Sequence, residues 1–370
     1  MNKAALALTC AIAAGFNPSS VFANDWIDPV DGQLDASKWL LDNAYGFMPF
    51  PIMLTDPDIG NGGGAALLFF HETDEQKKVR TENPDKVASI APSVSGLVAL
   101  GTDNGSNIYG GFHNGVWNDD TIRYEGGAYK ANLNVQFYGF GDATKMNVDG
   151  MWIYQKINFR LGKKSNWWLG ADYNYTSGDI TFDNQKDLKL TDKDSTLGVK
   201  LAYDSLDNKF SPEQGIKAGL TYTRAAKALG GDFDYDKLEL DVQSHHKLNE
   251  QWIASWRTKA INLSDGAAFY NKPSIDLRGM ANLRHQGNRV FQGEAQLTYK
   301  IDPRWSVLGF AGAGTAYDND TLGNKNPKFH GAYGAGFRHL VARQLGLKWG
   351  VDVAQSKDES TVTLQFGSAW

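Results

Sequence analysis

The segment Ser274–Met280, S-I-D-L-R-G-M, places one arginine in a stretch without regular alternation of apolar and polar residues. The neighbours of Arg278 in this segment are Leu277, Gly279 and Met280. This semi-apolar setting suits a segment that folds inward, where a guanidinium needs a carboxylate partner because an unpaired charge away from water is costly. Glu294 is the candidate partner. The alternative is a solvated arginine on a surface loop.

Histidine is the other residue type that could carry catalysis or bind a metal. The sequence places histidines at positions that include His113, His245, His246, His285, His330 and His339. None has the spacing of a nucleophile motif or of H-E-x-x-H. Adjacent histidines of a strand point to opposite faces and cannot share a metal. The glycine run Gly62–Gly64 precedes a strand, whereas a phosphate loop precedes a helix. We expect a non-enzymatic chain without a metal site or cofactor.

Arg278, Glu294 and the histidines must be positioned by segments in which apolar and polar residues alternate with a period of two. In the last ten residues, Val362, Leu364, Phe366 and Trp370 fall on one face, opposite Gln365. Elsewhere the charged residues share one face and the apolar residues the other. About 16 such segments occur, mostly ten to sixteen residues long, which suits tilted strands that cross a bilayer. The alternative is a soluble sandwich with shorter strands.

Loop lengths give a second sign of an up-and-down barrel. The short turns expected on one side are 118–120, 164–166, 249–251 and 302–303. The longer loops expected on the other side are 135–148, 183–193, 266–287 and 318–328. Outer-membrane barrels arrange their loops in this way. The charged stretch 73–86 falls on the short-turn side and is the exception.

Composition agrees with a barrel that has a wet interior. The chain has 370 residues, 12% aromatic residues, 40 glycines and a mean hydropathy of -0.42. No run after the N-terminus approaches the roughly 18 apolar residues that a membrane-spanning helix needs. The net charge of -5, with both signs interleaved, argues against a nucleic-acid partner. The predicted fold is an all-β, about 16-stranded antiparallel transmembrane barrel.

The N-terminus predicts export. Residues 1–23 have a basic start at Lys3, a short apolar run and a small-residue cleavage site at Ala23. The only cysteine, Cys10, lies in that run, so the mature chain has no disulfide. We expect residues 1–23 to be a signal peptide, 24–48 a periplasmic segment and 49–370 a barrel in the outer membrane of a Gram-negative bacterium.

Two local features concern the membrane surface. The stretch Asp35–Ala44 predicts a short helix with Asp35 as its N-cap. This helix could lie on the membrane surface or brace the barrel mouth. Tryptophans cluster at the ends of the alternating segments, which predicts interfacial girdles. They are Trp167, Trp168, Trp252, Trp305 and Trp370.

The stretch Ile275–Met280, I-D-L-R-G-M, resembles the inward loop motif of the BamA/TamA-like outer-membrane superfamily, also called the bacterial surface antigen family. Its 16-stranded barrels fold this loop inward, and five strands follow it. Pro49–Ala65 resembles the first hairpin of the family, and Gly350–Trp370 resembles its last hairpin and C-terminal assembly signal. The stretch Asp204–Gly215 resembles its turn motif through Asp204, Asp207, Asn208, Phe210, Pro212 and Gly215.

Some positions depart from the family pattern. Leu206 stands where the turn usually has arginine, Met280 where the loop motif usually ends in an aromatic, and Trp370 where phenylalanine is more frequent. Gly312 occupies the place of an aspartate that often pairs with the loop arginine. The resemblance therefore implies Glu294 as the main partner of Arg278, with Asp352 as a second. About 25 residues precede the first strand, too few for a POTRA module, so a POTRA-less member is expected.

The expected working site is the seam between the first and last strands. Pro49 and Pro51 cannot donate hydrogen bonds in the ladder, so the first strand should pair weakly with the last. The seam residues are Pro49, Pro51, Ile52, Phe366 and Trp370. The alternative is that the prolines merely end a strand at the rim.

The resemblance implies a barrel that aids protein or lipid insertion or translocation when this seam opens. Its expected partners are outer-membrane lipids, an unfolded outer-membrane protein or lipid cargo, and a periplasmic helper or a second copy of the chain. The alternative function is a passive pore or structural barrel in which the Arg278 loop only narrows the lumen.

Overall fold

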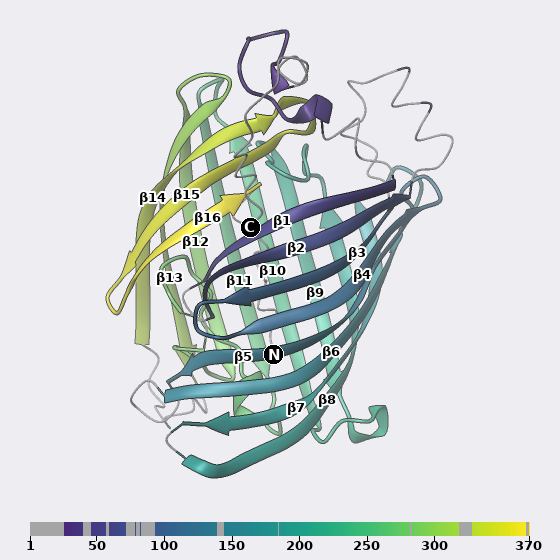
Figure 1. Cartoon of the computed structure of the whole chain (residues 1–370), viewed down its shortest axis with the longest axis vertical. Coiled ribbons are helices and arrows are strands. Elements are labelled where there is room, and N and C mark those ends of the chain that lie inside the picture. Colours follow the sequence, from purple (N-terminus) through teal and green to yellow (C-terminus); the bar gives the residue numbers. More distant parts are fainter. Residues whose placement is uncertain are drawn as a thin grey trace.

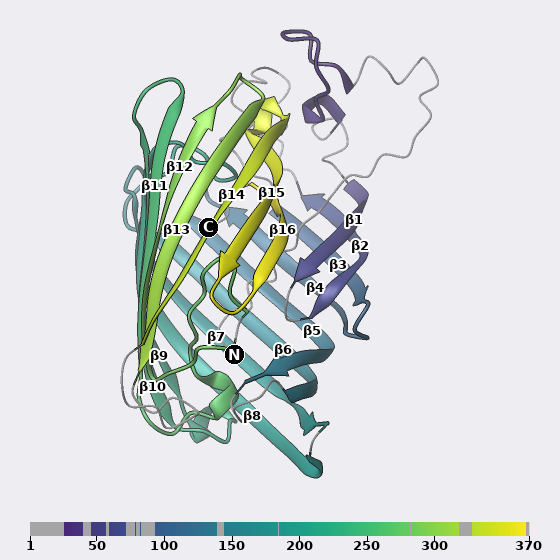
Figure 2. The ribbon, with the colours of Figure 1, turned by 90° about the vertical axis from the view of Figure 1, so that its left-hand side faces the viewer.

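Sixteen antiparallel strands form a single curved sheet in the computed structural model (Figures 1 and 2), and every strand pairs with the next one along the chain. The predicted all-β, 16-stranded architecture is confirmed, and five strands follow the Arg278 loop. The structure describes residues 26–39, 46–56, 59–71, 78, 82, 93–138, 144–183, 185–281, 283–317, 328–367 and 370. The predicted signal peptide, the charged stretch 73–86 apart from residues 78 and 82, and the second half of the predicted helix, residues 40–44, lie outside these residues.

The strands are long, as expected for a sheet that crosses a membrane at a tilt. Their bounds are β1 (Gly46–Asp56), β2 (Gly60–His71), β3 (Ser93–Thr102), β4 (Asn107–Trp117), β5 (Ile122–Phe137), β6 (Thr144–Arg160), β7 (Trp167–Phe182), β8 (Gln185–Asp204), β9 (Gly215–Ala225), β10 (Tyr235–Lys247), β11 (Trp252–Leu263), β12 (Arg289–Lys300), β13 (Trp305–Tyr317), β14 (Lys328–Ala342), β15 (Leu347–Ser356) and β16 (Ser360–Phe366).

Helical structure is limited to short turns in the described part of the chain. Three 3-10 turns cover Lys227–Leu229 (η3), Phe269–Asn271 (η4) and Arg343–Leu345 (η5), and residues 37–39 form a helical turn. Among the described residues, no helix has the length and apolarity needed to cross a membrane.

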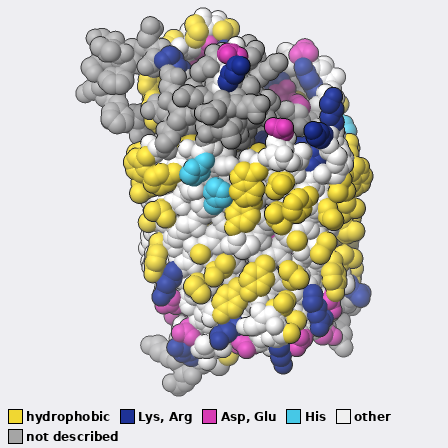
Figure 3. Space-filling view, turned by 90° about the vertical axis from the view of Figure 1, so that its right-hand side faces the viewer, with side chains coloured by type: hydrophobic (Ala, Val, Ile, Leu, Met, Phe, Trp, Pro, Cys, Tyr) yellow, Lys and Arg dark blue, Asp and Glu magenta, His cyan; other side chains and the backbone are white. Residues whose placement is uncertain are grey.

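The outer surface of the sheet is apolar. Leu97, Tyr109 and Phe291 are more than half exposed because the odd-numbered residues of these strands point outward. Figure 3 shows an apolar band across one face, with Lys, Arg, Asp and Glu gathered toward its two rims. This much exposed apolar surface would be unfavourable in water but suits contact with lipid chains.

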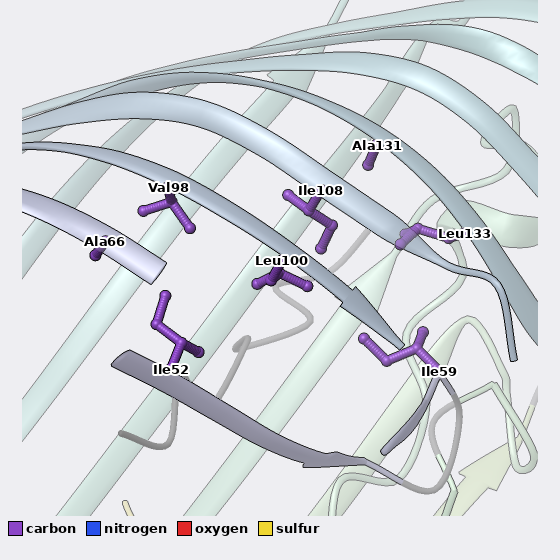
Figure 4. Close-up of a cluster of buried hydrophobic side chains, with 8 residues drawn as sticks. All are labelled: Ile52, Ile59, Ala66, Val98, Leu100, Ile108, Ala131 and Leu133. Atoms are coloured by element: carbon purple, nitrogen blue, oxygen red, sulfur yellow. The ribbon is translucent and has the colours of Figure 1, made fainter. Parts of the chain in front are cut away.

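The interior has two different parts. Charged and polar side chains from β5 to β11 line a cavity of about 550 Å³, among them Arg123, Glu239 and Lys259. On the inner face of β1 to β5, however, apolar side chains pack on one another (Figure 4). They include Ile52, Leu100 and Ile108. The expectation of a charged inner face therefore holds for the middle of the chain, whereas the wall near the first strand is apolar inside.

Tryptophans mark one end of the barrel. Trp167, Trp252 and Trp305 each begin a strand after a short turn and are 36–47% exposed on the outer face, as a girdle requires. Trp168 was also expected there, but it is 3% exposed and its ring is in contact with the guanidinium groups of Arg123 and Arg160. Adjacent residues of a strand point to opposite faces, so Trp167 and Trp168 could not share the girdle.

The β7–β8 hairpin corrects one loop prediction. The stretch 183–193 was expected to be a loop, yet β8 begins at Gln185 and pairs with β7 up to Phe182. The charges of this stretch obscured its alternation in the sequence. One of these charges, Lys189, lies 2.9 Å from Asp179 on the neighbouring strand.

Strands β1 and β16 are neighbours without a shared ladder. Fifteen consecutive pairs of strands share ladders, but none joins β16 to β1 among the described residues. Some Cα atoms of the two strands nevertheless lie within 8 Å of each other. β16 has 7 residues and β1 has 11, so a short strand faces a longer one at this edge.

Candidate functional site: the Arg278 loop and the strand edge

The connection between β11 and β12 runs inward and packs on the inner wall. Leu277 and Met280 are 3% and 7% exposed and join an apolar cluster with Ile261, Ile275, Val290 and Ala332. Gly279 adopts a φ of 91°, and a Cβ there would lie 3.0 Å from the Cβ of Ala354 on β15. Glycine is therefore required where the loop turns against the wall.

Arg278 is bound by two carboxylates. Its Nη2 lies 2.6 Å from Glu294 Oε1, and its Nε donates to the same oxygen over 2.9 Å. Its Nη1 donates to Asp352 Oδ2 over 2.9 Å. The side chains of both carboxylates are 1% exposed, and that of Arg278 is 9% exposed. The guanidinium also stacks on the Phe310 ring at 3.5 Å.

Asp352 has a second cation that sequence reasoning missed. Arg338 on β14 donates to both oxygens of Asp352, over 2.6 and 2.8 Å. This fork of two parallel hydrogen bonds is the strongest geometry for an arginine and a carboxylate. Arg257 on β11 lies 3.5 Å from Glu294. The cluster thus contains three guanidinium groups and two carboxylates, and it joins the loop to four strands of the wall.

The C-terminal residue closes the cluster. The indole Nε1 of Trp370 donates to Glu294 Oε1 over 2.8 Å, and its ring lies 5.5 Å from that of His245. Trp370 is therefore inside the barrel, which corrects its predicted place in a membrane girdle. A buried indole N–H needs an acceptor, and Glu294 provides one.

The surroundings of Gly312 explain why this position holds glycine and not the aspartate that the family often has. A Cβ at Gly312 would lie 2.8 Å from the Gly293 carbonyl oxygen, 3.0 Å from Leu277 Cδ2 and 3.1 Å from Glu294 Cβ. An aspartate at this position would displace Leu277 or Glu294. The second carboxylate comes instead from Asp352, two strands further along the sheet.

The five residues predicted for the seam lie in different environments. Pro49 and Pro51 are exposed on the outer face of β1 and remain in register with β2. Ile52 points inward and is 2% exposed. Phe366 shares the outward face of β16 with the exposed Val362. Trp370 is within the lumen, away from this edge.

The two prolines affect the free edge of β1. Since neither can donate to β2, the continuous register requires the even-numbered residues of β1 to form the ladder. The backbone nitrogens at Pro49 and Pro51 then face the β16 side. Both lack a hydrogen there, so this edge offers fewer donors to a partner strand.

The turn motif between β8 and β9 is held by its own side chains. Asn208 Oδ1 accepts from the backbone N–H groups of Phe210 and Ser211 over 2.7 and 3.0 Å, and Asp207 Oδ1 accepts from Glu213. Gly215 has a φ of 117°, which favours glycine. Asp204 accepts from the Leu206 N–H, and Pro212 is buried.

This turn reaches strands far along the sheet. Glu213 binds Lys300 of β12 and lies 3.4 Å from Lys348 of β15. Asn208 Nδ2 donates to the Leu345 carbonyl over 3.5 Å. The turn motif therefore braces β8 and β9 against the last strands at the tryptophan end of the barrel.

The N-terminal segment 26–39 also attaches to the last strands. Arg304, in the turn after β12, is fully buried and binds Asp28, Asp31 and Asp35 over 2.5–2.6 Å. Arg343, after β14, binds Asp28 over 2.5 Å. This segment precedes β1, so it links the β1 side of the open edge to turns on the β16 side. The predicted helix Asp35–Ala44 was expected either to lie on the membrane surface or to brace the barrel mouth. The contacts of its described part favour the second alternative.

These contacts hold the carboxyl groups ionised. The hydrogen bond from Arg343, with smaller contributions from the Val30 N–H and both arginines, lowers the pKa of Asp28 below 3.8. Burial alone would raise the pKa of Asp35, but hydrogen bonds from Ser37, Arg343 and Arg304 outweigh it and lower the pKa. Sequence reasoning missed this site, because the acidic residues look like an ordinary solvated stretch.

Comparisons with known proteins place this fold. The Omp85 superfamily domain matches residues 117–368. The structure resembles BamA from Haemophilus ducreyi lacking POTRA domains 1–3, with a TM-score of 0.60, 12% identity, and coverage of 88% of this chain and 70% of that one. No curated protein matches the sequence.

Two further structures are similar. CdiB from Escherichia coli has a TM-score of 0.61 and 9% identity, with 86% of this chain and 61% of that chain covered. CdiB from Acinetobacter baumannii has a TM-score of 0.53 and 9% identity, with 87% and 57% covered. The chain thus spans about three fifths of the CdiB structures. At such low sequence identity, these similarities show a shared fold only.

The matched domain covers well over half of the chain and includes the Arg278 loop, both carboxylates and the turn motif. The fold, a sheet of 16 strands in consecutive order, is that of the similar structures. The resemblance inferred from short motifs is therefore confirmed, and this chain belongs to the Omp85 superfamily of outer-membrane barrels, which are not enzymes.

Proposed function

We propose that this protein assists the insertion or translocation of proteins or lipids at the outer membrane, and that its working site is the edge between β1 and β16. The observation that carries the proposal is the missing ladder between these two strands among the described residues. An edge with free backbone groups can pair with a strand of another chain.

Two features support an edge that opens while the rest of the barrel stays closed. The prolines of β1 remove two donors from the β16 side, which weakens closure there. The Arg278 cluster ties the loop to β11, β12, β14 and β15 through buried ion pairs. We propose that this cluster holds the last strands as one body while β16 separates from β1.

The proposed partners follow from the same features. The apolar outer band suits outer-membrane lipids, and an unfolded outer-membrane protein or a lipid would be the cargo at the edge. A periplasmic helper or a second copy of the chain would deliver or share that cargo. The predicted signal peptide would export the chain to the outer membrane.

A disulfide across the edge tests this proposal. Ile52 and Phe366 point to opposite faces, so the cysteines should replace residues of the outward face. Phe47 or Met53 of β1 would be combined with Val362 or Phe366 of β16, and the four pairs would be scanned for crosslinking. Each variant would be reconstituted in liposomes and assayed, oxidised and reduced, for insertion of an unfolded eight-stranded barrel.

The matched control is Val353→Cys with Val362→Cys. These residues face each other in the β15–β16 ladder and are both exposed. We expect the β1–β16 crosslink to abolish insertion until it is reduced and the β15–β16 crosslink to leave it intact. A crosslinked edge with full insertion activity would contradict the proposal.

A passive pore is the second candidate, because the cavity of about 550 Å³ is lined by charges of both signs. A pore would conduct ions steadily in planar bilayers and would conduct equally with the β1–β16 crosslink in place. An insertion barrel would show small or irregular conductance that the crosslink alters.

A further inference from the structure

Three side chains that are distant in sequence meet at the barrel end opposite the tryptophan girdle. His285 follows the Arg278 motif in the inward loop, His330 lies near the start of β14, and Asp358 lies in the turn between β15 and β16. One ligand atom of each lies within 4.8 Å of the others. The His285 Nε2 is 3.3 Å from Asp358 Oδ2, and the two imidazole rings are 3.5 Å apart.

The arrangement leaves one buried nitrogen without a well-formed hydrogen bond, although Asp358 lies 3.3 Å from it. His285 Nε2 is buried and makes no hydrogen bond with any described residue. A buried polar atom without a partner is costly, so such an atom usually has a ligand, an ion or a water molecule beside it. Here the atom faces a carboxylate and a second imidazole.

Two imidazoles and one carboxylate form a common ligand set for Zn²⁺ and similar ions. Bonds of about 2.1 Å in a tetrahedral site place ligand atoms roughly 3.4 Å apart. His285 and Asp358 already have this separation. The other ligand atoms lie within 4.8 Å, so binding of an ion would draw the His330 side chain closer.

We propose that His285, His330 and Asp358 bind a divalent transition-metal ion such as Zn²⁺. The charged residues next to these three ligands are compatible with a bound cation. Arg284 lies 3.7 Å from Asp358 Oδ1, so it uses the other oxygen and leaves Oδ2 for the metal. Glu359 lies 4.0 Å from Arg284 and offsets its charge.

The metal would fasten the inward loop to the last hairpin. Glu359 already accepts from the Ala281 N–H over 2.6 Å, so the same turn touches the loop at two points. An ion at His285, His330 and Asp358 would join the loop, β14 and the β15–β16 turn at one point beside the open edge. Binding of the ion does not depend on the proposed insertion function.

Metal titration of the full chain tests the site. The detergent-solubilised protein, first dialysed against a chelator, would be titrated with Zn²⁺ by calorimetry and with Co²⁺ by visible absorption. The test variants are His330→Gln and Asp358→Asn. The control is His113→Gln, because His113 and His71 both contact Ser95 on the outer wall and could bind metal adventitiously.

We expect one equivalent of Zn²⁺ in the wild type and in His113→Gln, and at least tenfold weaker binding in both test variants. Heat-modifiable migration on gels would show that each variant is folded, and if His330→Gln fails to fold, Asp358→Asn decides. Absence of saturable one-equivalent binding would overturn the proposal. Retention of wild-type affinity in the folded test variants, or its loss in His113→Gln, would overturn it as well.

Discussion

Asp352 joins the loop arginine to an arginine of the barrel wall. It binds Arg338 through both oxygens and Arg278 through one, and its side chain is 1% exposed. Asp352→Asn would leave two buried guanidinium groups short of a counter-charge, so we expect a loss of about 3–5 kcal/mol in the free energy of unfolding. Urea unfolding in lipid vesicles measures this. Glu250→Gln, whose side chain is 89% exposed, should change it by less than about 1 kcal/mol.

Trp370 offers a milder test of the same cluster. Trp370→Phe keeps an aromatic ring beside His245 but removes the N–H that Glu294 accepts. We expect a folded barrel that is less stable by about 1.5–3 kcal/mol, the range for a hydrogen bond to a charged group. Trp167→Phe on the exposed girdle is the control in the same unfolding assay. Equal effects of the two substitutions would argue that the indole N–H has no special role.

At the scale of elements, the segment 26–39 is held by ion pairs to two turns. Arg304→Ala would remove the buried guanidinium that binds Asp28 and Asp35 and leave Asp28 with Arg343 alone, so we expect the segment to detach. A fluorophore on Val30→Cys, which is 73% exposed, would report detachment as a fall in anisotropy. Arg224→Ala, a 46% exposed arginine, is the control. Unchanged anisotropy in Arg304→Ala would show that other contacts suffice.

We also expect the attachment of segment 26–39 to depend on pH, which the fluorophore on Val30→Cys would report. The pKa values of Asp28, Asp31 and Asp35 are below 3.8 in the folded chain. A carboxyl group with a lowered folded pKa stabilises the attached state above its unfolded pKa, and this stabilisation is lost as the pH falls through the folded value. We expect constant anisotropy from about pH 8 to 5 and a fall below about pH 4. A transition near pH 6 would point to histidine instead.

At the scale of the whole molecule, the continuous ladders predict strong resistance to detergent. Sixteen strands with consecutive pairing should keep the barrel folded in cold sodium dodecyl sulfate and unfold it on boiling, which changes its migration on gels. The proposed weak point is the edge between β1 and β16. A β1–β16 crosslink should therefore raise the temperature at which migration changes, whereas the Val353–Val362 crosslink should raise it less.

The sequence by itself determined the fold and the main motif. Alternation with a period of two is a local property of the chain, so the strands of the barrel were visible in it, apart from the charged start of β8. The loop motif indicated Arg278 and Glu294 because a buried guanidinium requires a carboxylate, and the family resemblance added Asp352. The same alternation places adjacent residues of a strand on opposite faces of the sheet, so Trp167 and Trp168 lie on opposite faces.

Only the tertiary structure decided which distant residues meet. Arg338 joins Asp352, Trp370 enters the lumen, Arg304 binds three aspartates, and His285 meets His330 and Asp358. No spacing in the sequence encodes these contacts, because they depend on how the sheet curves and how far the loop reaches inward. The missing ladder between β1 and β16 among the described residues has the same origin, because the order of strands is local but the meeting of the first and the last depends on the whole barrel.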